Sequence, residues 1–370
     1  MLIRSISLRD FRNYARAELE LAEGLTVVHG PNGAGKTNLL EAIYFSLTAR
    51  SCRTSNEREL VRSGERVTRV VAEVAADDGA HTLEVGFSPG EKEKRVRVDG
   101  AELERGGAPP PRPLVCVFLP DRLELIKGAP ASRRSHLDQV VAAMWPARSE
   151  TRSAYARALA QRNALLARVR AGASRADQLD AWDVELARHG AQLMADRARV
   201  VAAIAPAFTT RAAELGLPEP VELRYAPRSK SADADGLRGE LSERRAADLE
   251  RGFTTHGPHR DDLALLHGGR PLRTLGSQGQ QRVGLLALLF AERDVLGARR
   301  RPPLMLLDDV MSELDATRRE RLAELVRAGG QALITTTDVE HVPGASSTSG
   351  VAVAAVLYGT VARDDAALAA

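Results

Sequence analysis

The sequence has few cysteines and aromatic residues, and it has no long apolar run. Cys52 and Cys116 are its two cysteines, and their separation suits neither a disulfide framework nor a zinc site. Aromatic residues make up only 4% of the chain, so we expect a core of Leu, Val, Ile and Ala. No run of about 18 apolar residues exists, which argues against a transmembrane span. The N-terminus lacks the apolar core and cleavage site of a signal peptide, so we expect a cytoplasmic protein.

The chain is long enough for two lobes and apolar enough to fold. Its 370 residues are 44% hydrophobic, which excludes a disordered protein. The net charge of +3 is compatible with a polyanionic partner, although a solvated surface explains so small an excess equally well.

Both ends of the sequence carry the patterns of β-strands. Alternating apolar residues predict a hairpin within residues 1–29, and Leu25–His29 is an apolar run of the kind that is buried on both faces. A glycine-rich loop and a helix from about Thr37 follow. Further strands are predicted at 67–74, 82–87, 95–98, 114–118, 304–307, 332–335 and 351–357. We expect loops at 106–113 and 344–350, and a frayed tail after Gly359.

The middle of the chain is predicted to be helical from about Pro130 to Arg251. A break at Gly172–Ser174 suggests a short antiparallel helical hairpin, with an ordinary helical subdomain as the alternative. We therefore predict an α/β protein whose first lobe, residues 1–125 and 252–360, is a mixed sheet around a phosphate-binding loop. The inserted second lobe, residues 126–251, is mainly α-helical, and the packing of the segment near 277 with this lobe stays open.

A phosphate-binding loop is predicted where the apolar strand meets the first helix. The segment fits G-x-x-x-x-G-K-[ST] and consists of Gly30, Pro31, Asn32, Gly33, Ala34, Gly35, Lys36 and Thr37. Glycines let backbone amides surround a β-phosphate, and Lys36 adds a cation for the β- and γ-phosphates. Thr37 opens the helix, so its hydroxyl is placed to bind Mg²⁺ beside ATP.

Two acids follow the apolar strand at 304–307. We predict that Asp308 is the carboxylate on the metal side and that Asp309 orients or deprotonates the attacking water. Asp315 is a further candidate for nucleotide binding. It starts the next helix as a plausible N-cap, and capping alone is the alternative role for it.

The segment Ser277–Arg282 precedes an apolar helix and resembles the signature motif of ABC ATPases. Alone, a Ser at a helix start is a cap, but this one stands shortly before the acidic strand. By that resemblance Ser277, Gln278 and Gly279 bind the γ-phosphate held by another protomer. ATP would then join two subunits, and hydrolysis would release them.

Several segments together resemble the RecF family, in the right order from about residue 1 to 340. They include Asp10–Tyr14, His29–Glu41 and Phe118–Asp121, followed by Leu125–Gly128 and Arg133-Arg134. The most specific is Thr255–Leu263, which contains Gly257-Pro258-His259-Arg260-Asp261-Asp262. Ser277–Arg282, Leu306–Asp315 and Thr335–Asp338 complete the set.

The resemblance implies an ABC-type ATPase head that binds ATP and Mg²⁺ and dimerises when ATP is bound. It also implies slow, DNA-stimulated hydrolysis and binding of double-stranded and gapped DNA at the nucleoid, in recombinational repair and replication restart. RecR and RecO are the implied partners, and together they place RecA on gapped DNA.

The resemblance also suggests roles for residues outside the motifs above. Arg12 corresponds to an early arginine near the nucleotide, although a surface arginine is the simpler alternative. Asp338 stands where transporters of the ABC class carry a switch histidine, so it is a candidate sensor of the γ-phosphate. Asp309, shorter than the usual Glu, suits slow turnover. No glutamine of the Q-loop type can be identified.

Basic clusters are candidates for DNA contact, although each is more often a solvated face. They are Lys92, Lys94, Arg95 and Arg97 on one strand, Arg133 and Arg134, and Arg299–Arg301. Contacts to phosphates alone would suit recognition of DNA structure rather than sequence.

Three other classes of protein share parts of this pattern. The alternative we retain is a short SMC-like ATPase with a structural role on DNA, but the predicted helical hairpin is far shorter than SMC coiled coils. A transporter subunit would be expected to carry a switch histidine and a Q-loop glutamine. A nuclease of this type would need a further acidic metal-binding domain.

Overall fold

A computed structural model describes residues 1–90, 93–103, 113–218, 220–298, 301–312, 314–346 and 348–363. The chain divides into two compact units, residues 1–121 with 296–370, and residues 122–295.

The first unit contains an antiparallel sheet with the strand order β2-β1-β4-β5-β6-β7. Its strands are β1 (Leu2–Phe11), β2 (Tyr14–Glu20), β4 (Thr68–Ala76), β5 (Gly79–Ser88), β6 (Glu93–Val98) and β7 (Ala101–Glu102). Apolar and polar residues alternate along these strands, so that one face is buried and the other is exposed. We call the exposed face the outer face.

The second sheet of this unit has the order β15-β14-β3-β13-β12-β8 and is parallel except for the pairing of β15 with β14. Its strands are β3 (Leu25–His29), β8 (Val115–Phe118), β12 (Leu304–Leu307), β13 (Ala332–Thr336), β14 (Val351–Leu357) and β15 (Thr360–Arg363). Leu307 pairs with Ile334, and Thr336 pairs with His29, so the carboxyl ends of β12, β13 and β3 lie at one edge. Catalytic and ligand-binding groups of open parallel sheets gather at this edge.

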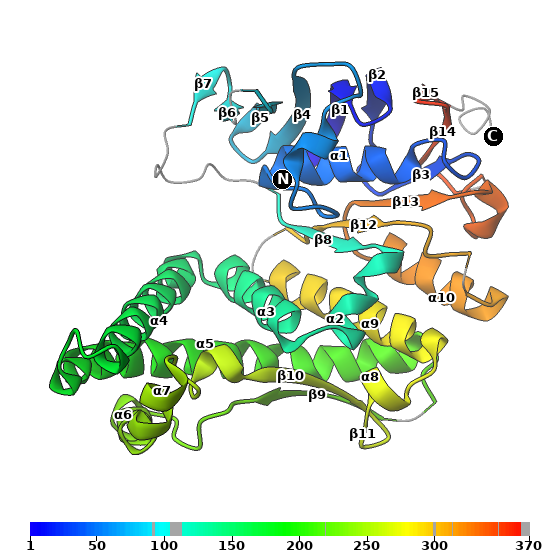
Figure 1. The fold of residues 1–370 in the computed structure, drawn as a ribbon. Coiled ribbons are helices and arrows are strands. Elements are labelled where there is room, and N and C mark those ends of the chain that lie inside the picture. Colours follow the sequence, from blue (N-terminus) through cyan, green and yellow to red (C-terminus); the bar gives the residue numbers. More distant parts are fainter. Residues whose placement is uncertain are drawn as a thin grey trace. The chain divides into compact units, whose positions relative to one another are not determined.

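Helix α1 (Lys36–Thr48) lies between the two sheets, and α10 (Ala316–Arg327) lies on the other side of the parallel sheet (Figure 1). The buried faces of β1, β4 and β5 form one apolar core with α1. Phe45 of α1 packs against Phe11 of β1, with ring centroids 6.0 Å apart. This core holds the start of α1 at the end of β3.

The second unit consists of helices and a small antiparallel sheet with the order β11-β10-β9 (Figure 1). Its helices are α2 (Glu124–Lys127), α3 (Pro130–Met144), α4 (Ser149–Arg170), α5 (Leu179–Glu214), α6 (Ala234–Glu243), α7 (Arg245–Arg251), α8 (Leu272–Leu275) and α9 (Gln278–Gly297), the last ending at the unit boundary. Its strands are β9 (Val221–Ala226), β10 (Asp262–His267) and β11 (Arg270–Pro271). Single turns of 3-10 helix occur at Glu57–Leu60, Pro120–Leu123, Pro146–Arg148, Ala176–Gln178, Pro258–Arg260 and Val339–His341.

The fold class predicted from the sequence is confirmed, and so are the predicted hairpin and the buried strands. Helices α4 and α5 pack side by side as the expected hairpin, with the chain turning between Arg170 and Leu179. No helix among the described residues is both long enough and apolar enough to cross a bilayer.

Three details of the predicted organisation differ from the structure. Strand β9 lies inside the stretch predicted to be helical, because its six residues pair with β10 rather than continuing a helix. The second unit continues to Val295 instead of ending at Arg251, because β10 belongs to it and so does α9, the segment whose packing the sequence left open. Thr360–Arg363, predicted as part of a frayed tail, pairs with Ala354–Leu357 as β15. Most of the predicted loop at 106–113 and the end of the tail lie outside the described residues.

Candidate functional site

The predicted phosphate-binding loop connects β3 to α1, as expected, and it depends on its glycines. Gly30, Gly33 and Gly35 have φ angles of 149°, 79° and 121°, a region that side chains rarely adopt. A Cβ atom on Gly30 would lie 2.1 Å from the carbonyl oxygen of Val356, and one on Gly35 would lie 2.6 Å from Nδ2 of Asn13. At Gly30 and Gly35, therefore, any residue other than glycine would require its surroundings to shift.

Residues far from the loop in sequence hold it in place. Asn13 Nδ2 donates to the carbonyl of Ala34 at 3.0 Å, and the Tyr14 hydroxyl donates to the carbonyl of Gly35 at 3.0 Å. The backbone amide of Gly359 also donates to Ala34, at 3.1 Å. In the sequence, Asn13 and Tyr14 stand out only through a family resemblance, and Gly359 belongs to no predicted motif.

Lys36 is largely buried, and its side chain turns back over the loop. Its Nζ donates to the carbonyls of Gly30 at 2.7 Å and Pro31 at 3.1 Å. Burial lowers the pKa of Lys36, while the nearby carboxylates of Asp309 and Asp308 act in the opposite direction. The side chain thus places a positive charge against the loop that carries it.

Asp308, directly after β12, meets the first turn of α1. The Thr37 hydroxyl donates to its two carboxylate oxygens, at 3.0 Å and 2.8 Å, and the Thr335 hydroxyl donates to Oδ1 at 2.6 Å. Burial raises the pKa of Asp308, and the two hydroxyl hydrogen bonds oppose that rise. Thr335, at the end of β13, is a site residue that the sequence analysis did not single out.

Asp309 has a backbone conformation that is rare for a residue with a side chain, with φ at 45°. Its backbone amide donates to the carbonyl oxygen of Thr335 at 3.1 Å and to the Thr335 hydroxyl at 3.0 Å. Its Oδ1 is buried without a hydrogen-bond partner among the described residues. Backbone strain and an unsatisfied buried oxygen each destabilise the folded state by about 1–3 kcal/mol, and such features are found most often at functional sites.

The residues at this edge fit a magnesium ion. A Thr hydroxyl and an Asp carboxylate are oxygen ligands of the type that Mg²⁺ accepts in nucleotide sites. The described residues hold no group of three or more His, Cys, Asp or Glu side chains arranged for a metal ion. Thr37 and Asp308 would therefore supply two ligands and leave the others to phosphate oxygens and water.

Arg12, predicted near a nucleotide, lies in the turn between β1 and β2 and binds Glu41 of α1. Its Nε and Nη2 donate to the two oxygens of this fully buried carboxylate, at 2.9 Å and 3.0 Å. Ser51 donates to the same carboxylate at 2.5 Å, and Arg53 lies 3.5 Å from it. Glu41 is thus the centre of a charged cluster beside α1 that the sequence analysis missed.

Asp315 and Asp338 both act as helix caps. Asp315 is the N-cap of α10, as predicted, and accepts from the amide of Arg318 at 2.9 Å. Asp338 follows β13 and accepts from the amide of Glu340 at 3.0 Å. Because β13 ends beside β3, Asp338 belongs to the same edge of the sheet as the phosphate-binding loop.

The signature segment belongs to the second unit, where it starts α9. Ser277 and Gln280 form a reciprocal pair of capping bonds, in which the Ser277 amide donates to Gln280 Oε1 at 2.8 Å and the Gln280 amide donates to Ser277 Oγ at 3.2 Å. Ser277 and Gln278 are exposed, and Gly279 is half-buried. Gln281 fixes the preceding turn by donating to the carbonyls of Leu272 and Gly276, both at 3.0 Å.

The basic clusters predicted as DNA contacts have different surroundings. Lys94 is bonded to Glu57 and to the carbonyl of Ala49, while Arg95 and Arg97 lie on the outer face. Arg133 is buried, and its guanidinium donates to both carboxylate oxygens of Asp262. Arg133 therefore does not belong to a basic surface.

Arg134 is half-buried and donates to the carbonyl of Asp261 at 2.7 Å. Arg301 lies 2.9 Å from Asp77. Lys92, Arg299 and Arg300 lie outside the described residues, as does Glu313 after the acidic strand.

Similarity to known proteins shows which family this chain belongs to. A family model described as an AAA domain matches residues 5–135. The DNA replication and repair protein RecF of Streptomyces avermitilis is 40% identical over 93% of this chain and 95% of its own length. The chain belongs to the RecF family. RecF of Heliobacterium modesticaldum is also 40% identical, over 91% of this chain and 92% of its own length.

Solved structures agree with this membership and with the ABC-type ATPase fold. A structure described as the recombination mediator protein RecF-ATP in the RecFOR pathway has 29% identity and a TM-score of 0.85, covering 98% of this chain and 97% of that one. An SMC head bound to the C-terminal winged-helix domain of ScpA has 16% identity and a TM-score of 0.60, covering 98% of this chain and 97% of that one. This second likeness concerns the fold alone. The RecF family is thus one of ATP-binding proteins of DNA replication and repair with an ABC-type head.

Proposed function

We propose that this RecF-family chain is a switch controlled by ATP. It would form a dimer when ATP is bound and separate into monomers after hydrolysis to ADP. The amides of the loop from Gly30 to Thr37 would surround the β-phosphate of ATP, and Lys36 would contact its β- and γ-phosphates. Mg²⁺ would be held by Thr37 and Asp308 and would offset the negative charge of the phosphate oxygens. The observation that carries this assignment is the contact of the Thr37 hydroxyl with Asp308 at 2.8 Å, at the end of the loop.

Asp309 is the residue we propose for orienting or deprotonating the attacking water. It follows Asp308 at the edge of the sheet, and its Oδ1 is buried without a partner among the described residues. A carboxylate oxygen held in this way can accept a proton or a hydrogen bond from water. Asp338, at the end of the adjacent strand, would sense the γ-phosphate, and Arg12 would act near the nucleotide while its guanidinium is held by Glu41.

The exposed start of α9 supports a site that is shared between two copies. Ser277, Gln278 and the amide of Gly279 in one copy would bind the γ-phosphate of ATP held by the other copy. ADP lacks that phosphate, so slow hydrolysis would release the dimer.

Membership in the RecF family supports a proposal for the partners of the switch. We propose that the chain binds double-stranded and gapped DNA at the nucleoid of the cytoplasm and that DNA stimulates its weak hydrolysis. RecR and RecO would act with it so that RecA is placed on gapped DNA. Solved relatives described as members of the RecFOR pathway support these partners.

A structural SMC-like role is less well supported. The SMC heads share 16% identity or less with this chain, against 40% for RecF of Streptomyces avermitilis. Helix α4 has 22 residues, which corresponds to only about 33 Å.

The test is the molar mass in solution, measured by light scattering with ATP or ADP, with and without a gapped duplex. A dimer that forms only with ATP, is absent from Ser277→Arg and is strengthened by DNA supports the switch. A monomer under every condition, also when RecR is added, would refute it.

A further inference from the structure

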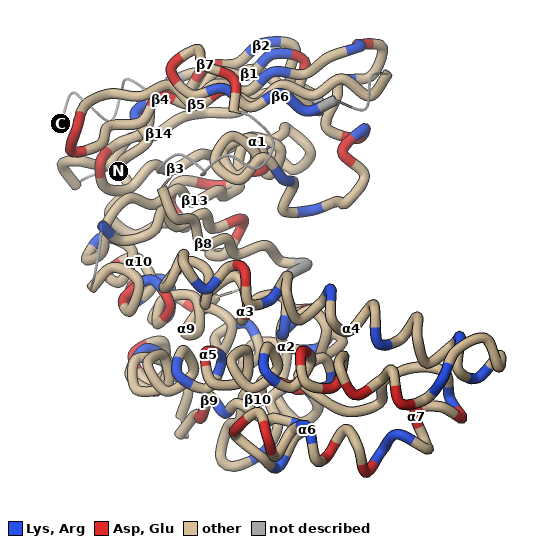
Figure 2. Tube along the Cα trace, turned by 90° about the vertical axis from the view of Figure 1, so that its left-hand side faces the viewer, with Lys and Arg blue, Asp and Glu red and all other residues tan. Residues whose placement is uncertain are grey.

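The outer face of the antiparallel sheet carries a row of arginines on neighbouring strands. Arg16 of β2 pairs with Arg9 of β1, and Arg9 pairs with Arg69 of β4. Arg69 pairs with Gly86 of β5, which in turn pairs with Arg95 of β6. Directly paired residues point to the same side of a sheet, so these four arginines form one line, which we call the arginine row. Figure 2 shows Lys and Arg positions on neighbouring strands of this sheet.

The arginine row is exposed and places like charges on directly paired residues. The exposed fractions of the side chains of Arg16, Arg9 and Arg69 are 82%, 79% and 54%. Like charges on directly paired residues destabilise a sheet, because their Cβ atoms are only about 5 Å apart. Strands lie about 4.8 Å apart, so the row extends over about 19 Å from β2 to β6.

Acidic residues lie next to the arginine row, but their weak ion pairs do not prevent the row from binding other anions. Arg16 lies 3.1 Å from Glu18, and Arg69 lies 2.6 Å from Glu84. Arg9 has a weaker contact, 3.7 Å from Asp10. Exposed pairs of this kind contribute about 0–1 kcal/mol, so phosphate oxygens can replace the carboxylates at little cost.

A shallow hollow lies beside the arginine row. It has a volume of about 570 Å³, and Arg9, Arg16, Arg69, Ser7 and Val71 contribute to its lining. No aromatic side chain contributes to the lining, so the hollow offers no platform on which an unpaired base could stack. The surface therefore suits a phosphate backbone better than unpaired bases.

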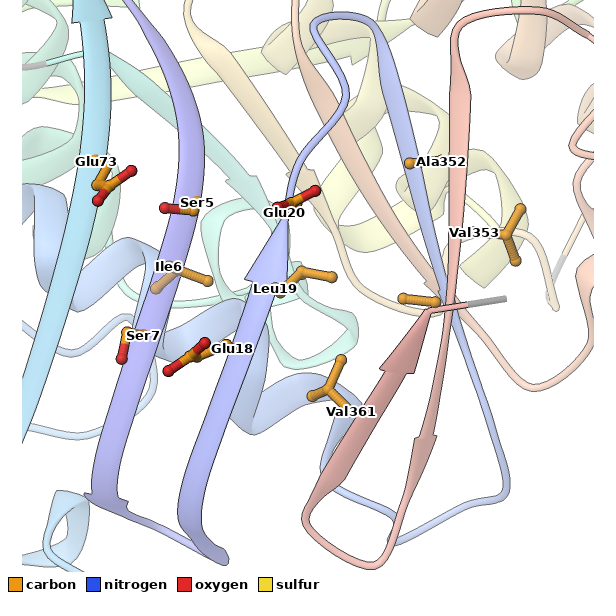
Figure 3. Close-up of a pocket in the computed structure, with 11 residues that line it drawn as sticks. Ser5, Ile6, Ser7, Glu18, Leu19, Glu20, Glu73, Ala352, Val353 and Val361 are labelled. Carbon is orange, nitrogen blue, oxygen red and sulfur yellow. The ribbon is translucent and has the colours of Figure 1, made fainter. Parts of the chain in front are cut away.

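The other end of the outer face has the opposite charge. Glu20 of β2 and Glu73 of β4 both pair with Ser5 of β1, and together they form an acidic line across the same strands. Figure 3 shows these residues beside a second hollow, of about 480 Å³, that Val353 and Val361 complete. A polyanion on this face would be attracted to the arginine row and repelled from the acidic end, which fixes its position.

We propose that the arginine row binds the phosphate backbone of double-stranded DNA. This inference rests on the proposed binding of DNA and names the surface that performs it. The row is longer than the roughly 12 Å width of the major groove, so its two ends can contact both backbones of one duplex. Guanidinium groups on phosphates read no bases, so binding by this surface does not depend on sequence.

The test compares two triple variants in which three arginines become glutamine. Arg9→Gln, Arg16→Gln and Arg69→Gln remove the row, whereas Arg175→Gln, Arg188→Gln and Arg238→Gln remove the same charge from exposed positions of the second unit. Affinity for a short blunt duplex is measured by fluorescence anisotropy in the presence of ATP, between about 50 and 200 mM salt. We expect the row variant to bind at least about tenfold more weakly, and its salt dependence to fall by about 2.7 in slope, because three phosphate contacts are lost.

Two further measurements separate loss of binding from loss of folding or of assembly. The three substitutions remove both the repulsion between paired arginines and their weak exposed ion pairs, so the row variant should unfold at about the same temperature as the wild type. The variant with Glu20→Gln and Glu73→Gln should bind the duplex as well as the wild type or more tightly.

The outcomes distinguish the inference from the proposed function. A wild type that binds no duplex refutes the proposed function. A wild type that binds, with a row variant equal to the charge-matched control, overturns the inference alone. A row variant that keeps its affinity for DNA but loses the ATP-dependent dimer assigns the surface to a second copy and also overturns it.

Discussion

The Thr37 hydroxyl lies 2.8 Å from Oδ2 of Asp308, although 271 positions separate the two residues in the chain. Thr37 stands in the first turn of α1 after β3, and Asp308 stands directly after β12. Strand β13 lies between β3 and β12 and adds the Thr335 hydroxyl to the same carboxylate. Parallel strands thus bring a loop residue, a hydroxyl and a carboxylate to one edge, where the proposed ATP and Mg²⁺ would bind.

Lys36→Arg is expected to abolish ATP hydrolysis. The ammonium group of Lys36 sits within 2.7 Å of the Gly30 carbonyl in a largely buried place, and the larger planar guanidinium cannot occupy it. Phosphate release should fall by at least about 100-fold. A variant that turns ATP over at the wild-type rate would remove Lys36 from the site.

Asp309→Asn should bind ATP and hydrolyse it about 100-fold to 1000-fold more slowly. The amide keeps the shape of the side chain but cannot take a proton from water. The amide can still fill the buried place of Oδ1, so ATP should bind and the dimer should form. Because hydrolysis is slow, light scattering should show that the dimer persists. Unchanged turnover with this variant would show that another group activates the water.

Gly35→Ala should disturb the loop more than Gly33→Ala does. Both glycines have positive φ angles, so the backbone strain is shared. A Cβ on Gly35 would also lie 2.6 Å from Asn13 Nδ2 and 2.9 Å from the Tyr14 hydroxyl, whereas one on Gly33 has no atom within 4 Å. Titration with a fluorescent ATP analogue should therefore show a greater loss of affinity for Gly35→Ala, by about tenfold. Equal losses would mean that Asn13 and Tyr14 do not hold the loop.

Ser277→Arg should leave ATP binding intact and prevent the ATP-dependent dimer. The added side chain would occupy the exposed start of α9 and meet the partner's nucleotide. Ser277→Ala is the matched control, since it removes the same capping bond, worth about 1 kcal/mol, without adding bulk. Dimerisation of Ser277→Arg with ATP would contradict the shared site.

The sequence predicted the parts of this site that are contiguous or that end a strand. The loop from Gly30 to Thr37 carries its strand, glycines and helix start within one segment, and Asp308 directly follows an apolar strand. In contrast, Asn13, Tyr14 and Gly359 act through contacts with Ala34 and Gly35 that no spacing encodes. Their role depends on strand pairing, which a single sequence leaves open.

The errors in the fold and in the basic clusters have similar causes. Residues 221–226 alternate like a strand but are short and lie between helices, so helical periodicity around them dominated the prediction. Arg133 looked like surface charge because its partner, Asp262, is 129 positions away. The arginine row was hidden for the same reason, since its members come from four strands and only the register joins them.

Acid should destabilise the second unit partly through His259. Its Nε2 lies 3.0 Å from the Thr254 carbonyl, which can only accept, so Nε2 carries the proton and Nδ1 accepts from the Tyr155 hydroxyl at 2.8 Å. Burial lowers the pKa of His259 from 6.5 to about 4, and the charges of Arg260 and Arg134 act in the same direction. The folded state therefore holds the neutral ring.

Between about pH 6.5 and pH 4 the unfolded chain binds a proton at this position that the folded chain does not. The stabilising contribution is thus complete above pH 6.5 and is lost as the pH falls through this interval, by at most about 3 kcal/mol. Urea unfolding of His259→Gln at several pH values should show a shallower dependence than the wild type in this interval, whatever its absolute stability. Equal slopes for wild type and His259→Gln would mean that other groups account for the acid sensitivity.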